Sequence, residues 1–306
     1  MLPCGRMQRK EYVVDLLLIS VVTIWGVNYA VMKMMYRYFH PIAFNAIRFT
    51  IASITMMTII RARGQTLRID RKDWRGVVWL GLLGNTLYQF FYMFGLARTG
   101  AGNAALLMAL SPVFAFLIGV WTKREHFSPG VLMGIILSLT GAAAIVVFGS
   151  GELSFAGSWV GNLLMICAAV FWGWQSVEAT RLLPKYGAIP LTVSTMIVGT
   201  AVMLPLSLPW VTTQNFRGIP PAAWLGLAFS ALLSITYSYF VWAYALKRIG
   251  VSHTSVFNNV TPIAAVISGW YLLGEQPSVA QLAGVVLVLT GVFMVRTKPR
   301  IEQVNG

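Results

Sequence analysis

Residues 132–141 read LMGIILSLTG, and residues 282–291 read LAGVVLVLTG. The same correspondence runs without a gap from residue 96 to residue 141, at a constant offset of 150 positions. Identical pairs along it include Pro112/Pro262, Glu125/Glu275, Ser128/Ser278, Gly134/Gly284 and Gly141/Gly291. A chain that contains one half twice is expected to fold with two-fold pseudosymmetry, and in a membrane this symmetry is typical of transporters.

The composition indicates an integral membrane protein. The chain has 306 residues, of which 57% are hydrophobic and only 10% are charged. A soluble domain with so few charges would have too little polar surface to face water. The net charge of +14 does not indicate nucleic-acid binding, because Lys and Arg occur in short clusters between apolar runs. Cys4 and Cys167 show no metal-ligand spacing, so we expect no disulfide, no metal and no cofactor.

Ten apolar runs are long enough to cross a bilayer as helices. We predict these spans at residues 12–36, 41–60, 76–97, 101–122, 130–149, 157–180, 190–211, 221–246, 251–273 and 279–295. The short connections make sequential helices antiparallel neighbours. The predicted fold class is therefore all-α integral membrane.

The distribution of Lys and Arg predicts the orientation of these spans. If the N-terminus is cytoplasmic, the inner segments carry 18 of these residues and the outer loops carry three. This bias places both termini in the cytoplasm. The loop after the third span then faces outside, whereas its copy after the eighth faces inside. We therefore predict two inverted five-helix repeats, residues 1–150 and 151–306.

Several of these features resemble the drug/metabolite transporter superfamily, in its EamA-like branch. The similar residues are Arg48-Phe49 in the second span, the Ser111-Pro112 and Thr261-Pro262 steps, the Glu125 and Glu275 turns, and the Gly134…Thr140-Gly141 and Gly284…Thr290-Gly291 patterns. The resemblance covers nearly the whole chain. It implies that the first, third, fourth, sixth, eighth and ninth spans surround a central cavity, with the fifth and tenth set aside as supports.

The central spans also carry most of the polar and aromatic side chains. An amide or phenol that faced lipid would lack hydrogen-bond partners, so these groups should face a cavity or another helix. Polar contacts that only hold the helices together are the alternative. The candidate substrate-cavity residues are Trp25, Asn28, Tyr88, Gln89, Tyr92, Met108, Trp172, Gln175, Ser238, Trp242 and Asn258.

Arg48 is the cation deepest inside a span. A charge there is costly unless it is paired, so Arg48 either contacts a substrate carboxylate or has a fixed packing role. Pro112 and Pro262 each remove one backbone donor inside a span and are candidate hinges, or else simple bends.

No carboxylate lies near the middle of a span, which favours downhill facilitated transport over proton antiport. Glu125 and Glu275 each precede a Ser that begins a helix, so we expect a structural role at that helix start. Glu178 should pair with Arg181, three residues further along the same helix.

A cavity of Trp, Tyr and carboxamide side chains suits a small amphipathic molecule. Phosphorylated sugars would require Arg or Lys at the midplane. Together with the similar architecture of YddG-type aromatic amino-acid exporters, this favours export of aromatic or other hydrophobic amino acids from a bacterium through its inner membrane. Export of other amphipathic metabolites or drugs is the alternative, and a membrane enzyme or a channel is less favoured. The sequence is compatible with a homodimer.

Overall fold

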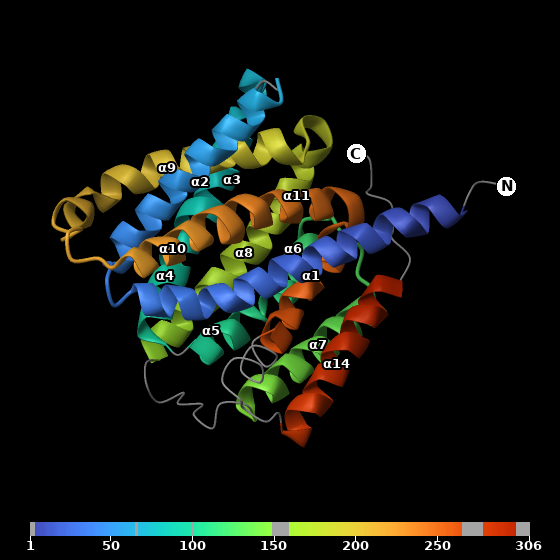
Figure 1. Ribbon diagram of the computed structural model, residues 1–306. Coiled ribbons are helices and arrows are strands. Elements are labelled where there is room, and N and C mark those ends of the chain that lie inside the picture. Colours follow the sequence, from blue (N-terminus) through green and yellow to red (C-terminus); the bar gives the residue numbers. More distant parts are fainter. Residues whose placement is uncertain (1–3, 65–66, 100, 149–158, 265–277, 298–306) are drawn as a thin grey trace.

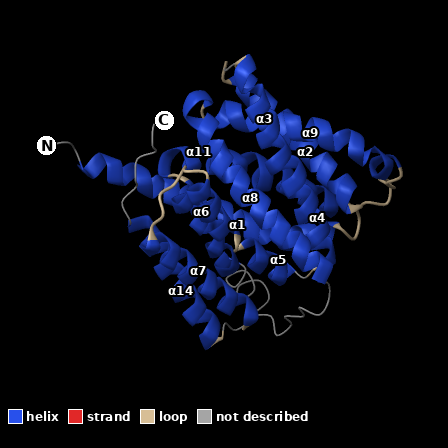
Figure 2. Ribbon diagram, turned by 180° about the vertical axis from the view of Figure 1, so that it is seen from behind, coloured by secondary structure: helices blue, strands red, loops and turns tan. Residues whose placement is uncertain are grey.

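The computed structural model describes residues 4–64, 67–99, 101–148, 159–264 and 278–297. Within these residues the regular elements are all helices, joined by loops (Figures 1 and 2). Nine helical runs in this part of the chain are long and apolar enough to cross a membrane: Tyr12–Met35, Pro41–Ala62, Arg71–Arg98, Asn103–Trp121, Pro129–Val147, Trp159–Tyr186, Ala188–Thr212, Pro221–Ile249 and Val279–Thr297. The predicted all-α membrane class is therefore confirmed.

The elements of the first half cover its five predicted spans. They are α1 (Cys4–Met35), α2 (Pro41–Ala62), η1 (Arg71–Asp73), α3 (Trp74–Gly81), η2 (Leu82–Leu87), α4 (Tyr88–Arg98), α5 (Ala101–Met108), α6 (Ser111–Trp121) and α7 (Pro129–Val147). The third span is a continuous run from η1 to α4. The fourth span is interrupted between α5 and α6.

The second half has α8 (Trp159–Tyr186), α9 (Ala188–Thr212), α10 (Pro221–Phe229), η3 (Ser230–Tyr237), α11 (Ser238–Ile249), α12 (Val251–Ser255), η4 (Val256–Val260) and α14 (Val279–Thr297). Of the predicted ninth span at 251–273, residues 265–277 lie outside the described part. Its described beginning contains α12 and the 3-10 segment η4, followed by helical residues 261–264.

Two wide helical turns interrupt the third and eighth spans at matching places. Both η2 and η3 have π-helical geometry, in which a backbone N–H bonds to the carbonyl five residues earlier. In η2 the N–H of Tyr88 donates to the carbonyl of Leu83. Such a turn changes which side chains face a neighbour in the residues that follow. Segments of this kind are frequent at functional sites.

The supporting helices α7 and α14 pack side by side (Figure 1). A Cβ added at Gly134 would lie 2.9 Å from the carbonyl oxygen of Gly291, and one added at Gly141 would lie 2.6 Å from that of Gly284. The start of one helix therefore meets the end of the other, so these repeat-equivalent helices are antiparallel. Small residues at the crossing let the two backbones approach closely. This packing agrees with an inverted repeat.

The helix starts after the matched glutamates are only partly as predicted. Ser128 Oγ accepts from the N–H of Val131 at 3.5 Å, and Ser278 Oγ accepts from the N–H of Gln281 at 3.1 Å, so each Ser caps its own helix. Glu125, however, does not serve the helix that follows it. Its carboxylate accepts from the N–H of Ser252 at 2.8 Å and from the Ser252 hydroxyl, and so caps α12 in the other half. Glu275 lies outside the described residues.

The predicted pairing of Glu178 is also wrong. Glu178 Oε1 lies 3.9 Å from Nη2 of Arg124, on the loop between α6 and α7, instead of pairing with Arg181. The two ends of the fold are tied further by Asp15 of α1, which accepts from Arg296 Nη2 of α14 at 2.9 Å.

Candidate functional site

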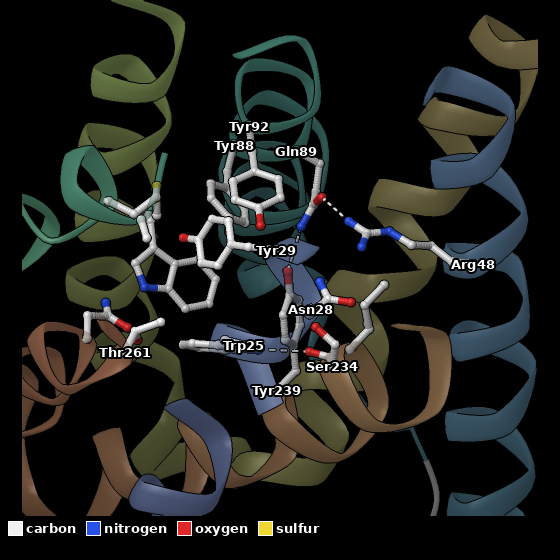
Figure 3. Close-up of a pocket in the computed structure, with 15 residues that line it drawn as sticks. Trp25, Asn28, Tyr29, Arg48, Tyr88, Gln89, Tyr92, Ser234, Tyr239 and Thr261 are labelled. Carbon is white, nitrogen blue, oxygen red and sulfur yellow. Dashed lines mark hydrogen bonds between the residues drawn. The ribbon is translucent and has the colours of Figure 1, made fainter. Parts of the chain in front are cut away.

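A cavity of about 40 Å³ lies between the central helices (Figure 3). Side chains from the first, third, fourth, sixth, eighth and ninth spans line it, together with Arg48 from the second. The lining residues are Trp25, Asn28, Tyr29, Arg48, Tyr88, Gln89, Tyr92, Ala105, Met108, Trp172, Ser234, Ile235, Tyr239, Asn258 and Thr261. This volume holds a few water molecules. A larger solute would have to displace lining side chains.

Eight of the eleven candidate cavity residues lie on this lining: Trp25, Asn28, Tyr88, Gln89, Tyr92, Met108, Trp172 and Asn258. Gln175 and Trp242 instead line a second cavity of about 30 Å³, to which Trp172 also contributes. Ser238 lines neither cavity. Its hydroxyl is buried and donates to the carbonyl of Leu233 at 2.8 Å.

Aromatic rings form much of the cavity wall. The Trp172 ring lies 4.9 Å from that of Tyr88 and 5.3 Å from that of Trp25, measured between centroids, and the second pair meets edge to face. The indole N–H of Trp25 donates to the backbone carbonyl of Ser234 at 3.0 Å, which fixes this ring against η3 (Figure 3). Tilted and edge-to-face pairs at these separations are favourable, so the wall is preorganised for an apolar or aromatic group.

Arg48 is buried, with 2% of its surface exposed, and makes only neutral hydrogen bonds. Its guanidinium donates to Asn45 Oδ1 at 2.7 Å, Ser230 Oγ at 2.9 Å and Gln89 Oε1 at 2.7 Å, and reaches the sulfur of Met32. No carboxylate among the described residues forms an ion pair with it. A buried cation without a counter-ion is costly by several kcal/mol. The cavity wall therefore carries a positive charge that an anionic group could neutralise.

Three buried polar atoms around the two cavities have no hydrogen-bond partner among the described residues. They are the side-chain amide oxygen of Asn28, the indole N–H of Trp172 and the side-chain amide oxygen of Gln175. Buried polar atoms are normally paired, and an exception calls for a physical reason. A bound polar solute would supply the missing partners: a donor for each amide oxygen and an acceptor for the indole.

Six lining residues are not among the predicted site residues: Tyr29, Ala105, Ser234, Ile235, Tyr239 and Thr261. Ser234, Tyr239 and Thr261 belong to the polar central spans; the wide turn η3 contains Ser234 and directly precedes α11, which carries Tyr239. Tyr29 directly follows Asn28, and its ring lies 5.7 Å from that of Tyr92. Ala105 and Ile235 carry no polar group, so no chemical signal marks them.

The two candidate hinge prolines lie just after irregular backbone. Pro112 is near the start of α6, after the break at residues 109–110. Pro262 follows the 3-10 segment η4. The predicted fourth span at residues 101–122 is thus broken into two helices near Pro112, because α5 ends at Met108 and α6 begins at Ser111. A proline in the first turn of a helix loses no helical hydrogen bond.

Comparison with known proteins agrees with this architecture. A protein of Archaeoglobus fulgidus named an uncharacterized transporter is 29% identical over 94% of this chain and 99% of its own length. The uncharacterized transporter YyaM of Bacillus subtilis is 27% identical over 97% of both chains. A protein of Streptantibioticus cattleyicolor named a probable terminal-alkyne amino-acid exporter is 28% identical over 82% of both chains.

A solved crystal structure has the same fold, with a TM-score of 0.76 and 21% sequence identity over 92% of this chain and 96% of that one. The sequence model of the EamA-like transporter family matches residues 13–147 and again residues 159–297, one match in each half of the chain. The chain therefore belongs to the EamA-like transporter family and is a multi-pass membrane transporter.

Proposed function

We propose that this transporter exports small amino acids with a hydrophobic or aromatic side chain. The observation that carries the proposal is Arg48, a buried guanidinium at the cavity wall with no carboxylate partner among the described residues. A substrate carboxylate would supply the missing negative charge through a charge-assisted hydrogen bond. A neutral or cationic substrate would leave the guanidinium unneutralised.

The rest of the wall suits the other two parts of such a molecule. The unpaired side-chain amide oxygen of Asn28 is an acceptor for a substrate ammonium group. The rings of Trp25, Tyr88 and Trp172 offer an aromatic surface to the side chain. Support also comes from the relative named as a probable amino-acid exporter.

Transport would proceed by alternating access between the halves 1–150 and 151–306, with Pro112 and Pro262 as the hinges. The distribution of Lys and Arg supports an orientation with both termini in the cytoplasm of a bacterial inner membrane. Among the described residues, no Asp or Glu lines the central cavity. This favours downhill facilitated transport, without obligatory exchange for protons.

Counterflow in proteoliposomes tests the proposal. The purified protein is offered radiolabelled phenylalanine or leucine, and competition by each amino acid is compared with competition by its carboxamide. We expect the amino acids to compete and the carboxamides, which lack the carboxylate, to fail. Substituting Arg48→Met should lower amino-acid flux by roughly thirtyfold or more, since truncating one member of a buried charge pair costs at least about 2 kcal/mol.

Arg98→Met is the matched control, because Arg98 lies at the end of α4, packs on Phe94 and does not line either cavity. Its flux should equal that of the wild type. Equal competition by amino acids and carboxamides would contradict the proposal and favour export of other amphipathic metabolites or drugs. An absolute requirement for an imposed pH gradient would contradict facilitated transport.

A further inference from the structure

The central cavity and the second cavity share two lining side chains, Trp172 and Tyr239. Their ring centroids lie 5.8 Å apart. Beyond them, the second cavity is polar as well as apolar, with Asn85, Gln175, Thr192 and Thr195 among its lining residues. The two cavities are therefore adjacent, with this pair of rings in the wall that they share.

Tyr239 is joined to Arg48 through one residue. Gln89 accepts from Arg48 Nη2 through its Oε1 at 2.7 Å and donates from its Nε2 to the Tyr239 hydroxyl at 2.9 Å (Figure 3). The amide oxygen of Gln89 is thus bonded to the buried charge of Arg48, and its amide nitrogen is bonded to the Tyr239 hydroxyl. Whatever takes the Arg48 donor away from Gln89 also loosens the group that holds Tyr239.

The three residues come from three different elements. Arg48 is on α2, Gln89 is the second residue of α4, and Tyr239 is the second residue of α11. The π segments η2 and η3 precede Gln89 and Tyr239, respectively. Gln89 and Tyr239 are also separated by 150 positions, the offset of the repeat, so their hydrogen bond joins the two halves at equivalent positions.

We infer that Tyr239 is a movable partition between the two cavities and that a substrate carboxylate opens it through Gln89. This rests on the proposed function, because it needs a carboxylate at Arg48. A carboxylate makes a stronger bond to a guanidinium than a neutral amide does, so it displaces Gln89 Oε1 from Arg48. Gln89 then reorients, its bond to the Tyr239 hydroxyl is lost, and the ring is free to turn away from Trp172.

The coupling gives the resting transporter a closed pathway. Without substrate, the buried charge of Arg48 orients Gln89, and Gln89 holds the phenol between the cavities. Opening therefore follows occupancy, which limits leakage of other small solutes through the central helices. Tyr239 acts here by position and is distinct from the residues that contact the carboxylate.

Cysteine labelling measures this opening directly. Ala105 lines the central cavity and is not part of the Arg48–Gln89–Tyr239 chain, so Ala105→Cys reports on access to it. Cys4 and Cys167 are replaced by Ser in this background. The lining of the second cavity includes Leu183 and Leu191, which flank the junction of α8 and α9 beside Lys185. A membrane-impermeant thiol reagent is therefore added on the side of the membrane that carries Lys185, and the labelling rate is recorded with and without phenylalanine.

We expect phenylalanine to accelerate labelling of the otherwise unaltered reporter. Tyr239→Phe keeps the ring and removes the hydroxyl, so it should label about tenfold faster without substrate, equivalent to about 1.4 kcal/mol, and respond little to phenylalanine. Gln89→Met should behave in the same way if Tyr239→Phe does not fold. Tyr237→Phe is the matched control, because the Tyr237 hydroxyl bonds to Ser20, and it should label like the unaltered reporter.

The outcomes separate this inference from the proposed function. Unaltered labelling in both Tyr239→Phe and Gln89→Met would overturn the partition, even if counterflow shows amino-acid transport. Fast labelling of Tyr239→Phe, combined with no response of the reporter to any amino acid, would support the partition and contradict the carboxylate as its trigger. A response to phenylalanine but not to its carboxamide would support both.

Discussion

Repeat-equivalent helices contact each other in two pairs, α7 with α14 and α4 with α11. The contacting residues are identical between the two halves in the first pair and different in the second. In α7 and α14 the contact is made by residues identical in both copies, Gly134/Gly284 and Gly141/Gly291. Between α4 and α11 the contact is made by equivalent residues that differ, Gln89 and Tyr239. One symmetry therefore produces close packing in the first pair and a chemically asymmetric wall in the second.

The difference has a physical reason. Two backbones can approach closely only if neither copy carries a side chain at the crossing, so the packed pair requires glycine on both helices. A cavity for an asymmetric molecule needs a different group at each end. Arg48 illustrates this, since the equivalent helix of the second half, α9, contains no Lys or Arg. Identity between the copies thus marks the scaffold, and divergence marks the cavity.

The largest effect is expected where the scaffold is closest packed. A Cβ at Gly291 would lie 2.5 Å from both the carbonyl oxygen of Gly134 and the N–H nitrogen of Ser138. Because neither backbone atom can yield cheaply, Gly291→Leu should cost about 3 kcal/mol or more and abolish recovery of monodisperse protein in mild detergent. Gly218→Leu, at a glycine with open space around it, should be recovered normally. Equal yields would show that identity at the crossing is not required.

How far the fold could be predicted follows from the same division. Span length, charge bias and repeat identity depend on the bilayer and on backbone packing, so the described spans begin and end within a few residues of prediction for most helices. The sequence does not predict the π turns η2 and η3. They are set by which neighbouring side chains pack against the span, and no local pattern encodes that.

The consequence for the site is visible at Ser238 and Tyr239. Ordinary helical spacing places Ser234, Ser238 and Trp242 on one stripe. The wide turn η3 shifts the residues after it, so Tyr239 and not Ser238 lines the central cavity beside Ser234. The sequence therefore predicts the helices and most of the chemical groups of the site. It does not predict the rotation that selects one of two adjacent residues.

Replacing Asn258 by the residue of the other half makes the cavity less asymmetric. Asn258 lines it and donates to Ser111 Oγ at 2.8 Å, whereas the equivalent residue of the first half is Met108. Asn258→Met removes one polar group from the wall, so the ratio of leucine to serine transport in competition assays should rise about tenfold, or about 1.4 kcal/mol. Asn215→Met, the same substitution at an exposed position on the loop between α9 and α10, is a control outside the cavity and should leave this ratio unchanged. An unchanged ratio in Asn258→Met would show that divergence here is neutral.

Glu125 is identical to its repeat equivalent, Glu275, yet its carboxylate bonds to Ser252 in the other half. It therefore tests whether a residue shared by both copies also links them. Burial raises the pKa of the Glu125 carboxyl above its ordinary value of 4.5, although the hydrogen bonds from Ser252 oppose this. Its folded form thus disfavours the charge, and its contribution to stability is full at low pH and falls as the pH rises above about 4.5 through the raised pKa. Glu125→Gln mimics the protonated acid and should lack this fall.

The measurement is the unfolding temperature in detergent between pH 4 and pH 8. The wild type and Glu125→Gln should be close at pH 4, and the wild type should lose stability relative to the variant as the pH rises. Arg124, Lys123 and His126 on the same loop, and Glu178 beside Arg124, are present in both proteins, so the two proteins differ only at residue 125. A difference between the two proteins that does not change with pH would contradict the assignment.

The smallest expected effect concerns the helix caps Ser128 and Ser278, which are identical in the two copies. The question is whether they contribute equally to stability. Ser128 caps α7 at 3.5 Å from the N–H of Val131, with no reciprocal bond. Ser278 caps α14 at 3.1 Å from the N–H of Gln281, and the Gln281 side chain accepts from the Ser278 N–H at 2.7 Å, so both backbone donors are satisfied. Ser278→Ala should therefore cost about 1 kcal/mol and Ser128→Ala about 0.5 kcal/mol, read as unfolding temperatures in the same detergent. Because the two caps share no partner, their costs should add in the double variant. Equal costs would mean that the repeat fixes the strength of a cap as well as its position. The two halves would then differ only in the residues of the cavity.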